Sequence, residues 1–564
     1  MRHHAKKKKD DCPHINPCTS DEKIGSIVQV PSELTSDEYG IVHATFTFEM
    51  FIDDIGQTRY CYNYENKYRA PTIRLWPGET LHLIFINNIN TTTKAKFRLK
   101  PGCTGNGTST STNVHFHGLN IPPTCHEDNV VHTEIDDNDK FEFYMKIPFN
   151  EPSGNYWYHA HFHGLADAQV SGGATGALII EGIEYETKVI DGCYERIIVL
   201  RDEPVNSKTF TSDISINWVP IRVPNFEPAV ILSKPNRCEF WRITNAAADL
   251  FFNVSIINNQ TNKAYPFEII AIDSIVIRNE YTGRPETIIA HHYAMPVASR
   301  IEIKVQTPPK GEELIFMKNF LDRGVSFPND PVRPIARWQS KYDAPELPKI
   351  MKYKDNSRHK IERFRKVHDE VPAVNRTIRF FVDFTRKDGA FLVVVDFPNP
   401  EPAEPFKMNQ APNIIADTGT VEDWRIENCS PELHSFHIHQ IHFKVLEISG
   451  VPQPPGPLYD TFILPYYVNG TTNGTPVDTT KCPYVKVRMD FRDPDIAGDF
   501  VYHCHILGHE DAGMMGVIRL VDNNRKSKHQ PYYEPKEDDA VDEKLLYPIC
   551  QPNKIISMYK RYKP

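Results

Sequence analysis

Four His-x-His pairs constrain the fold of this chain more strongly than any other feature of its sequence. On a β-strand, residues two positions apart face the same side, so each pair presents two imidazoles to one side of its strand. One such pair is typical of a surface strand, whereas four pairs indicate a shared site for several metal ions. The pairs lie in NVHFHGLN (113–120), NYWYHAHFHG (155–164), PELHSFHIHQIHF (431–443) and YHCHILGHEDAGMMG (502–516).

The sequence around these motifs indicates an all-β fold. Short runs of alternating apolar and polar residues recur from about residue 42 to 182, again from ERIIVLRDEP, and a third time from NRTIRFFVDF onward. A period of two predicts half-buried antiparallel strands, and many short strands separated by turns predict sandwiches or barrels. The charged, proline-bearing segment from Arg333 to Glu370 is interpreted as a long connector between the second and third runs.

Composition excludes some classes of function. The net charge of -9 is spread along the chain and does not suit nucleic-acid binding. No apolar run reaches the roughly 18 residues of a membrane span. Eight Asn-x-Ser/Thr sequons and eleven cysteines favour a secreted glycoprotein with disulfides, although the N-terminal MRHHAKKKKDDC is not followed by the apolar segment of a signal peptide.

Cys504 stands between two of the paired histidines. Strand alternation points His503 and His505 to one side and Cys504 to the other, so a thiolate lies back to back with two imidazoles. If both sides bind metals, covalent bonds connect the two sites and provide a path for electrons. His434, His509 and Met514 are the candidate partners of Cys504, because two histidines, one cysteine and a weak axial methionine form the blue-copper ligand set.

With these motifs the sequence resembles the multicopper oxidases, the family of laccases, bilirubin oxidases and ferroxidases. The HILGHEDAGMM stretch is most similar to the branch of spore-coat laccases and bilirubin oxidases. The resemblance covers about residues 40 to 522 and implies three cupredoxin-like Greek-key β-sandwich or barrel domains. Their expected ranges are 40–185, 190–345 and 370–522, followed by a C-terminal tail at 523–564.

The resemblance also implies four copper ions and a ligand for every position around them. One type 1, one type 2 and two type 3 ions are expected. The implied ligands are His434, Cys504, His509 and Met514 for type 1; His115 and His437 for type 2; His117, His159 and His505 for one type 3 ion; and His161, His439 and His503 for the other.

Two acids and several other histidines lie close to these motifs. Asp128 and Glu510 stand where the family has an acid near the type 2 copper and an acid near the dioxygen channel, so both are expected to take part in catalysis together with Cys504. The remaining nearby histidines, including His163 and His442, fit no ligand position and are expected to be structural.

The implied activity is removal of single electrons from phenols or aromatic amines at the type 1 copper and reduction of dioxygen to water at the other three. The expected partners are a small-molecule reductant and dioxygen, and the protein is expected to be a monomer. A metallo-oxidase or bilirubin oxidase on the same scaffold, a copper electron-transfer protein without turnover and a multi-zinc hydrolase remain alternatives. The stretch GVPQPPGPLYDTFILPYY is a candidate wall of the substrate pocket.

Overall fold

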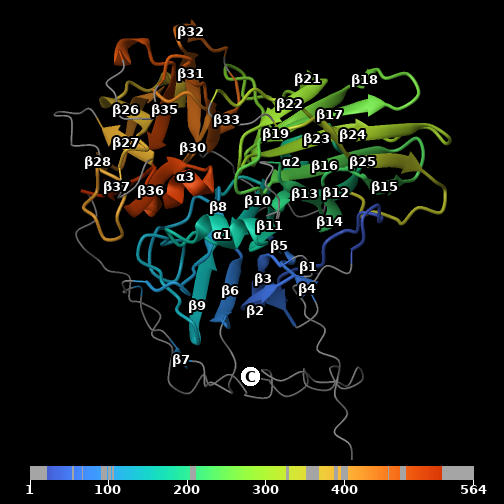
Figure 1. Ribbon diagram of the computed structural model, residues 1–564, viewed down its shortest axis with the longest axis horizontal. Helices are drawn as coiled ribbons and strands as arrows, with labels where there is room; N and C mark the ends of the chain where they lie inside the picture. The colour runs from blue at the N-terminus through green and yellow to red at the C-terminus, as the bar shows by residue number, and fades with distance from the viewer. Residues whose placement is uncertain are drawn as a thin grey trace, which may run out of the picture.

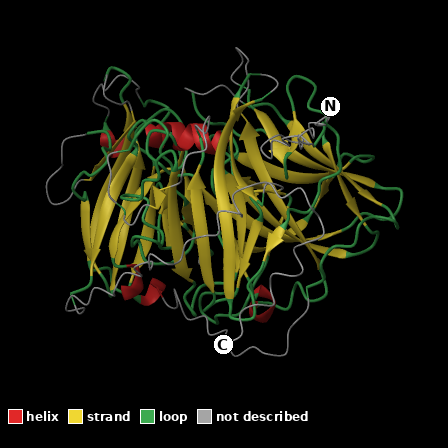
Figure 2. Ribbon diagram, turned by 90° about the horizontal axis from the view of Figure 1, so that it is seen from below, coloured by secondary structure: helices red, strands yellow, loops and turns green. Residues whose placement is uncertain are grey.

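Six β-sheets, paired face to face as three β-sandwich domains, make up the protein (Figure 1). The computed structural model describes residues 22–53, 56–65, 68–89, 98–99, 103, 107–203, 211–325, 330–350, 367–386, 391–395, 404–454, 456–470 and 478–523. Helices are few and short, and Figure 2 shows them at the margins of the strand layers. The predicted all-β fold of three sandwich domains is therefore confirmed.

The first sandwich contains two of the four histidine pairs. Its core alternates with the solvent face as expected, and β2 buries every second residue from Val42 to Phe48. One sheet has the strand order β1 (Glu33–Leu34), β5 (Thr72–Leu75), β11 (Thr175–Ile180), β10 (Gly154–His159), β8 (His115–His117). The other has the order β4 (Tyr68–Arg69), β3 (Thr58–Tyr64), β2 (Ile41–Ile52), β6 (Thr80–Asn87), β9 (Asp139–Lys146), β7 (Arg98–Leu99).

The second sandwich lies between the other two in sequence. One sheet has the order β14 (Val219–Ile221), β13 (Asp213–Ile216), β12 (Tyr194–Glu203), β16 (Cys238–Asn245), β23 (Arg300–Gln306), β19 (Phe267–Ile272), β20 (Ile275–Val276), with β21 (Ile288–Ala290) also paired to β19. The other has the order β15 (Ala229–Ser233), β25 (Arg333–Ser340), β24 (Glu313–Asn319), β17 (Phe252–Asn258), β18 (Ala264–Tyr265), with β22 (His292–Met295) also paired to β17. Trp241 and Trp338 pack against each other in the core, with ring centroids 4.6 Å apart.

The interpretation of residues 333–370 as a connector is wrong in its first part. Arg333–Ser340 forms β25, which lies between β15 and β24. The charged residues misled the prediction because Arg333 is fully buried and forms an ion pair with Asp330 inside the protein. Ile335, Ala336 and Trp338 of β25 still face the core.

The third sandwich contains the other two histidine pairs and Cys504. One sheet has the order β27 (Phe391–Val395), β26 (Val374–Val382), β29 (Thr420–Asn428), β35 (Tyr484–Phe491), β31 (Phe443–Ile448), β32 (Val451–Pro452), with β33 (Leu458–Tyr459) also paired to β31. The other has the order β28 (Ile414–Asp417), β37 (Met515–Val521), β36 (Gly498–Cys504), β30 (His434–Ile438), β34 (Thr461–Leu464). The proposed domain boundaries remain predictions, and the tail beyond residue 523 lies outside the described residues.

Two short helices join the first and third sandwiches. α1 (Ala166–Ser171) lies against α3 (Leu507–Asp511) at the junction, where Figure 1 shows them close to the centre of the molecule. The carboxylate of Asp511 accepts hydrogen bonds from the backbone N–H groups of Gly164, Ala166 and Asp167, at 2.7, 3.2 and 2.9 Å. Because these N–H groups open α1, Asp511 caps a helix of the other domain. The remaining α-helix, α2 (Ile183–Glu186), follows β11, and 3-10 helices lie at Val367–Asp369, Thr479–Lys481 and Pro494–Ile496.

Disulfides are present, as predicted, and Cys504 is the only described cysteine that is free. The pairs are Cys103–Cys125, Cys193–Cys238 and Cys429–Cys482, and Cys61 is also disulfide-bonded. One sequon is structural, since the buried Asn428 side chain donates to the carbonyl groups of Glu432 and Leu464 and cannot carry a glycan. Among the described helices, none has the length and apolarity needed to cross a membrane.

Candidate metal centres

Neighbouring strands bring the histidine pairs together within each domain. In the first sandwich β10 pairs with β8, which sets His159 opposite His115. In the third, β36 pairs with β30, which sets His503 opposite His437. All eight histidines are buried, and their rings face one another across the junction between the two sandwiches. We call this set the histidine cluster; its members are His115, His117, His159, His161, His437, His439, His503 and His505.

Three members of the histidine cluster converge on one point. The Nε2 atoms of His161, His439 and His503 lie 3.2 to 3.3 Å from one another. Such separations are what imidazoles bound to one metal ion at about 2 Å require. These are the three histidines that the family resemblance assigns to one type 3 copper. The other cluster histidines form overlapping groups, so their division between two further ions remains a prediction.

Hydrogen bonds outside the cluster set the direction of its lone pairs. Nδ1 of His159 donates to the carbonyl of Ala160 at 2.9 Å, and Nδ1 of His437 donates to that of Asp460 at 2.8 Å. Nε2 of each ring is then a bare acceptor that faces the cluster, and neither Nε2 atom has a hydrogen-bond partner. Burying a nitrogen acceptor without a partner costs free energy of folding unless that nitrogen binds a metal ion.

Electrostatics also fit a metal centre. Burial, together with the neighbouring imidazoles, holds the pKa values of the cluster histidines well below the ordinary value, and the pKa of His161 and that of His503 fall to about 4. The rings are therefore neutral at physiological pH and keep the lone pairs that a copper ion needs. The residues present thus fit the three copper ions implied here.

Cys504 belongs to a second, separate site. Its Sγ lies 3.5 Å from Nδ1 of His434 and 3.7 Å from Nδ1 of His509, and the two Nδ1 atoms are 3.2 Å apart. Burial raises the pKa of the Cys504 thiol far above its ordinary value, so a bound cation is needed to favour the thiolate. This trio, the thiolate site, suits a copper ion with mixed nitrogen and sulfur ligands.

Met514 lies at the thiolate site. Its carbonyl accepts the backbone N–H of Cys504 at 3.0 Å, and the whole residue is buried. If Met514 is the weak axial ligand that the family resemblance implies, Met514→Leu should raise the reduction potential of a copper ion bound at the thiolate site. Redox titration of the absorption at about 600 nm measures this change. A potential that is unchanged or lower would show that the Met514 sulfur is not a ligand.

Asp128 lies directly behind the histidine cluster. Both of its carboxylate oxygens are 3.0 Å from Nδ1 of His115, and they also accept from the backbone N–H of Phe116 and from Nε2 of Gln440. Asp128 therefore fixes the orientation of His115, as acids do behind metal-bound histidines. Burial raises its pKa to about 7.

Glu510 lies beside the histidine cluster. Its carboxylate is 3.0 Å from Nδ1 of His503 and 3.4 Å from Nδ1 of His161, and it is fully buried. Burial raises the pKa of Glu510 to about 7, with His161 acting in the opposite direction. The carboxylate therefore contacts two rings of the convergent trio from behind.

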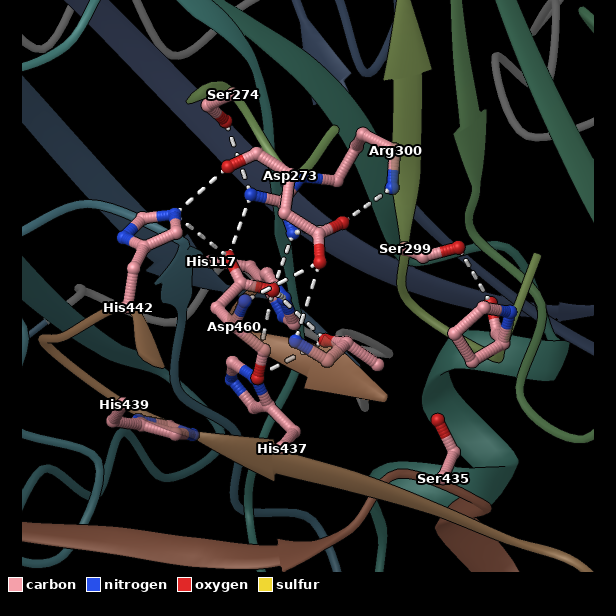
Figure 3. A network of polar contacts seen from close by, with 12 residues as sticks. His117, Asp273, Ser274, Ser299, Arg300, Ser435, His437, His439, His442 and Asp460 are labelled. Atoms are coloured by element: carbon pink, nitrogen blue, oxygen red, sulfur yellow. Dashed lines mark hydrogen bonds and ion pairs between the residues drawn. The ribbon is translucent and has the colours of Figure 1, made fainter. Parts of the chain in front are cut away.

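An acidic residue that the sequence reasoning missed completes the site. Asp460 lies within 3.3 Å of Nε2 of His117, and its two oxygens accept from both terminal nitrogens of Arg300, at 2.7 and 2.6 Å (Figure 3). Arg300 also contacts Asp273, 3.5 Å away, and all three charged groups are fully buried. The predicted structural histidine His442 belongs to the same network, with its Nε2 2.8 Å from the carbonyl of Asp273.

The only sequence signal for Asp460 was its place in GVPQPPGPLYDTFILPYY, which was expected to line the substrate pocket. That expectation stays a prediction; the segment of Asp460 runs into β34, which pairs with β30 and sets Thr461 opposite His437. Arg300 comes from β23 of the second sandwich, so residues from all three domains meet here. We call Asp460, Arg300 and Asp273 the interdomain ion network.

Comparisons with known proteins agree with this geometry. Family models described as "Multicopper oxidase" match residues 104–184 and 382–524. The chain is 23% identical to "Multicopper oxidase mco" of Staphylococcus haemolyticus, over 92% of this chain and 96% of that protein, and 22% identical to "Laccase" of Haloferax volcanii, over 85% and 81%. In fold it resembles a multicopper oxidase from Campylobacter jejuni described as a metallo-oxidase, with a TM-score of 0.62, 22% identity and coverage of 90% and 99%.

Proposed function

The chain belongs to the multicopper oxidase family, and on that premise we propose that it takes single electrons from a small reductant at the thiolate site and delivers them to dioxygen at the histidine cluster. The observation that carries this proposal is the sequence His503-Cys504-His505. Cys504 contacts His434 and His509 at the thiolate site, while Nε2 of His503 contacts the Nε2 atoms of His161 and His439 in the histidine cluster. Consecutive residues therefore connect the two centres by covalent bonds.

Copper bound at these centres supplies one-electron chemistry at the thiolate site and the four-electron reduction of dioxygen to water at the histidine cluster. The chain itself holds and orients the ligands. Asp128 holds His115. Nδ1 of His503 donates a hydrogen bond to the carbonyl of Cys504 at 3.1 Å, which holds His503 and adds a hydrogen-bonded connection between His503 and Cys504 to the covalent one. Because every ligand is buried, the cluster is also shielded from bulk water.

Reduction of dioxygen to water consumes four protons along with four electrons. The carboxyl group of Glu510 contacts two cluster rings, and its side chain has no solvent exposure. We infer that Glu510 holds a proton at its carboxyl oxygen and passes it toward the cluster, and that Asp128 mainly orients His115.

We expect Glu510→Gln to slow reoxidation of the reduced enzyme by dioxygen roughly tenfold or more, because the amide keeps the shape but cannot exchange a proton. Anaerobic reduction of the type 1 copper should stay within about twofold of the wild-type rate, since that step precedes the cluster. Stopped-flow measurement of the two half-reactions separates these effects. If the Glu510→Gln protein has all its coppers bound and is reoxidised at the wild-type rate, Glu510 has no role in proton delivery.

For the reductant, the first candidate class is phenols and aromatic amines. Electrons enter through His509, the thiolate-site histidine with measurable exposure, 4%. Phe391 stacks on its ring with centroids 3.9 Å apart, which gives the entry point an aromatic neighbour. The Haloferax volcanii relative carries the name laccase.

A second candidate class, divalent metal ions, is favoured by acids beside the same ring. Oε1 of Glu432 lies 3.7 Å from Nε2 of His509. A second carboxylate, the partly exposed Asp249, pairs with Arg323 at 2.7 Å. Burial raises the pKa of Glu432, Arg323 lowers it, and Asp249 is close enough to Glu432 to raise it as well. Carboxylates are suitable ligands for a ferrous or manganous ion that approaches the thiolate site. The relative from Campylobacter jejuni is described as a metallo-oxidase.

The two classes are separated by Glu432→Gln. If the reductant is a metal ion, kcat/KM for ferrous iron should fall about tenfold or more, because one carboxylate charge beside His509 is lost, whereas kcat/KM for a methoxyphenol should change less than about threefold. Oxygen consumption with a methoxyphenol, bilirubin and ferrous iron in parallel provides the measurement. Asp499→Asn, at a surface pair with Arg519, serves as the control. Efficient phenol oxidation with no ferrous activity would exclude the metallo-oxidase.

We also propose that the protein works outside the cell. The three disulfides between described cysteines support this location, since such bonds persist in oxidising compartments. The sequons other than Asn428 add to that support, and detection of a glycan or of the secreted protein would test it.

A further inference from the structure

A cavity of about 590 Å³ lies between the first and second sandwiches. Its wall is formed by β3 and β4, by Gly172 and Gly173 after α1, by the end of β12 and by Trp218. None of its lining residues belongs to the histidine cluster or the thiolate site. We propose that this cavity binds a small oxyanion, a carboxylate or a phosphate, through Arg201 and Arg222.

The first supporting observation is the backbone at Trp218. Asn217 and Trp218 form the two-residue turn between β13 and β14, with φ values of +45° and +73°. Positive φ at both positions favours Asn followed by Gly, and a bulky residue such as Trp is strained there. The strain is retained at a place where the indole ring faces the cavity and carries the guanidinium of Arg201 at 3.7 Å and that of Arg69 at 4.6 Å.

The second observation is an incompletely satisfied buried cation. Arg201 is only 3% exposed; its Nε donates to Oγ1 of Thr175 at 2.6 Å and its Nη2 to the carbonyl of Thr175 at 3.3 Å. Its Nη1 has no acceptor, and no described carboxylate lies within ion-pair distance of the guanidinium. Burial lowers the pKa of Arg201 to about 9, with Glu203 raising it and Arg69 lowering it. A buried guanidinium without a direct counter-charge is unfavourable unless something else supplies one.

Four acids line the cavity wall, and Glu22 as well as Asp53, Asp202 and Glu203 makes other contacts. Asp53 pairs with Arg59 at 2.7 Å, and Glu203 lies 3.6 Å from the same guanidinium. The Asp202 carboxylate accepts from the backbone N–H groups of residues 248–250. These contacts leave the Nη1 group of Arg201 without an acceptor from the wall.

Arg222 provides a second donor to the same cavity. It is half-buried, and its Nε also lacks a hydrogen-bond partner. Guanidinium groups bind carboxylates and phosphates through directed N–H donors, and such charge-assisted bonds are stronger than neutral ones. An oxyanion between Arg201 and Arg222 would satisfy both unpaired donors and neutralise part of the positive charge stacked on Trp218.

Isothermal titration of the copper-loaded full-length protein tests the proposal. Inorganic phosphate and benzoate are the two probes, each measured against chloride at equal ionic strength. We expect one or both to bind with one site per chain, Arg222→Gln to weaken binding about tenfold or more, and Arg201→Gln to abolish it. Arg237→Gln is the matched control, because Arg237 also stacks on an aromatic ring, that of Tyr194 at 4.4 Å, but does not line the cavity.

Binding of phosphate alone identifies a phosphate site, and binding of benzoate alone identifies a carboxylate site; either supports the proposal. Absence of binding to the wild-type protein would overturn it, as would equal affinity in the Arg222→Gln and Arg237→Gln proteins. Should Arg201→Gln fail to fold, the half-buried Arg222 still decides the question. Oxidase activity should be unchanged in Arg222→Gln, so this test is independent of the copper chemistry.

Discussion

Cys504→Ser should abolish both the absorption at about 600 nm and the oxidation of every reductant, down to the background rate of chemical oxidation. Cys504 is the only sulfur bonded in sequence to histidines of the other centre, so its loss removes a ligand and the electron path together. The histidine cluster should still bind three coppers, because none of its ring contacts involves the Cys504 side chain. Absorption spectra, copper content per chain and oxygen consumption measure the three results.

Met515→Leu is a suitable control for this variant. Met515 is also buried near the site, but it packs against Val130 and Phe406 in a small apolar cluster rather than at the thiolate site. Its replacement should leave colour and turnover close to wild type. Substantial oxidation by Cys504→Ser with three coppers bound would mean that electrons reach the histidine cluster by another route.

Asp460→Asn should destabilise the protein by about 3 kcal/mol, since it leaves the buried Arg300 without its direct counter-charge. The nearby Asp273 keeps the loss at the lower end of the expected range for a broken buried ion pair. Asp460 also contacts His117, so we expect copper content to fall below four per chain while the absorption at about 600 nm remains. Denaturant unfolding of the copper-free protein and copper analysis of the loaded protein provide the two measurements.

The pair Asp499–Arg519 gives a matched control for Asp460→Asn. It has similar bidentate geometry, with both contacts at 2.7 Å, but the Arg519 side chain is half exposed. Asp499→Asn should therefore lower the free energy of unfolding by less than about 1 kcal/mol. Equal losses in the two variants, or full copper loading in Asp460→Asn, would show that the interdomain ion network does not position the histidine cluster.

The contribution of Asp460 to the stability of the folded protein should be lost at low pH. Burial raises its pKa, but the charge and hydrogen bonds of Arg300 outweigh burial and lower the pKa below the ordinary value. A carboxylate whose pKa is lowered by folding stabilises the protein above its unfolded pKa of about 4, and this contribution is lost as the pH falls through the folded pKa. The stability difference between wild type and Asp460→Asn should therefore be constant near neutrality and shrink only in strong acid.

The sequence was sufficient to predict the histidine cluster because strand alternation is a local rule. His503 and Cys504 end β36 and point to opposite sides of it, as consecutive strand residues do, and the ring of His505, one residue past the strand end, still lies against those of His159 and His503. The interdomain ion network could not be predicted in this way. Arg300 and Asp460 are 160 residues apart and come from different domains, and nothing in their local sequences distinguishes them from surface charges.

Burial of polar side chains also explains the other misreadings. The segment beginning at Arg333 looked like a connector because its charges suggested solvent exposure, yet Arg333 is buried against Asp330. The sequon at Asn428 looked like a glycan site, yet its amide holds two backbone carbonyl groups inside the third sandwich. In each case a polar side chain has an internal partner that only the tertiary structure supplies.

The position of the histidine cluster between the first and third sandwiches affects biosynthesis. A nascent chain that ends before His434 contains only four of the eight cluster histidines and no part of the thiolate site. Domains of a long chain tend to fold in order of synthesis, so the first sandwich is complete well before its metal-binding partner exists. Stable copper insertion must therefore follow docking of the last domain, and truncation within the third sandwich would yield a folded first domain that is unable to retain the cluster.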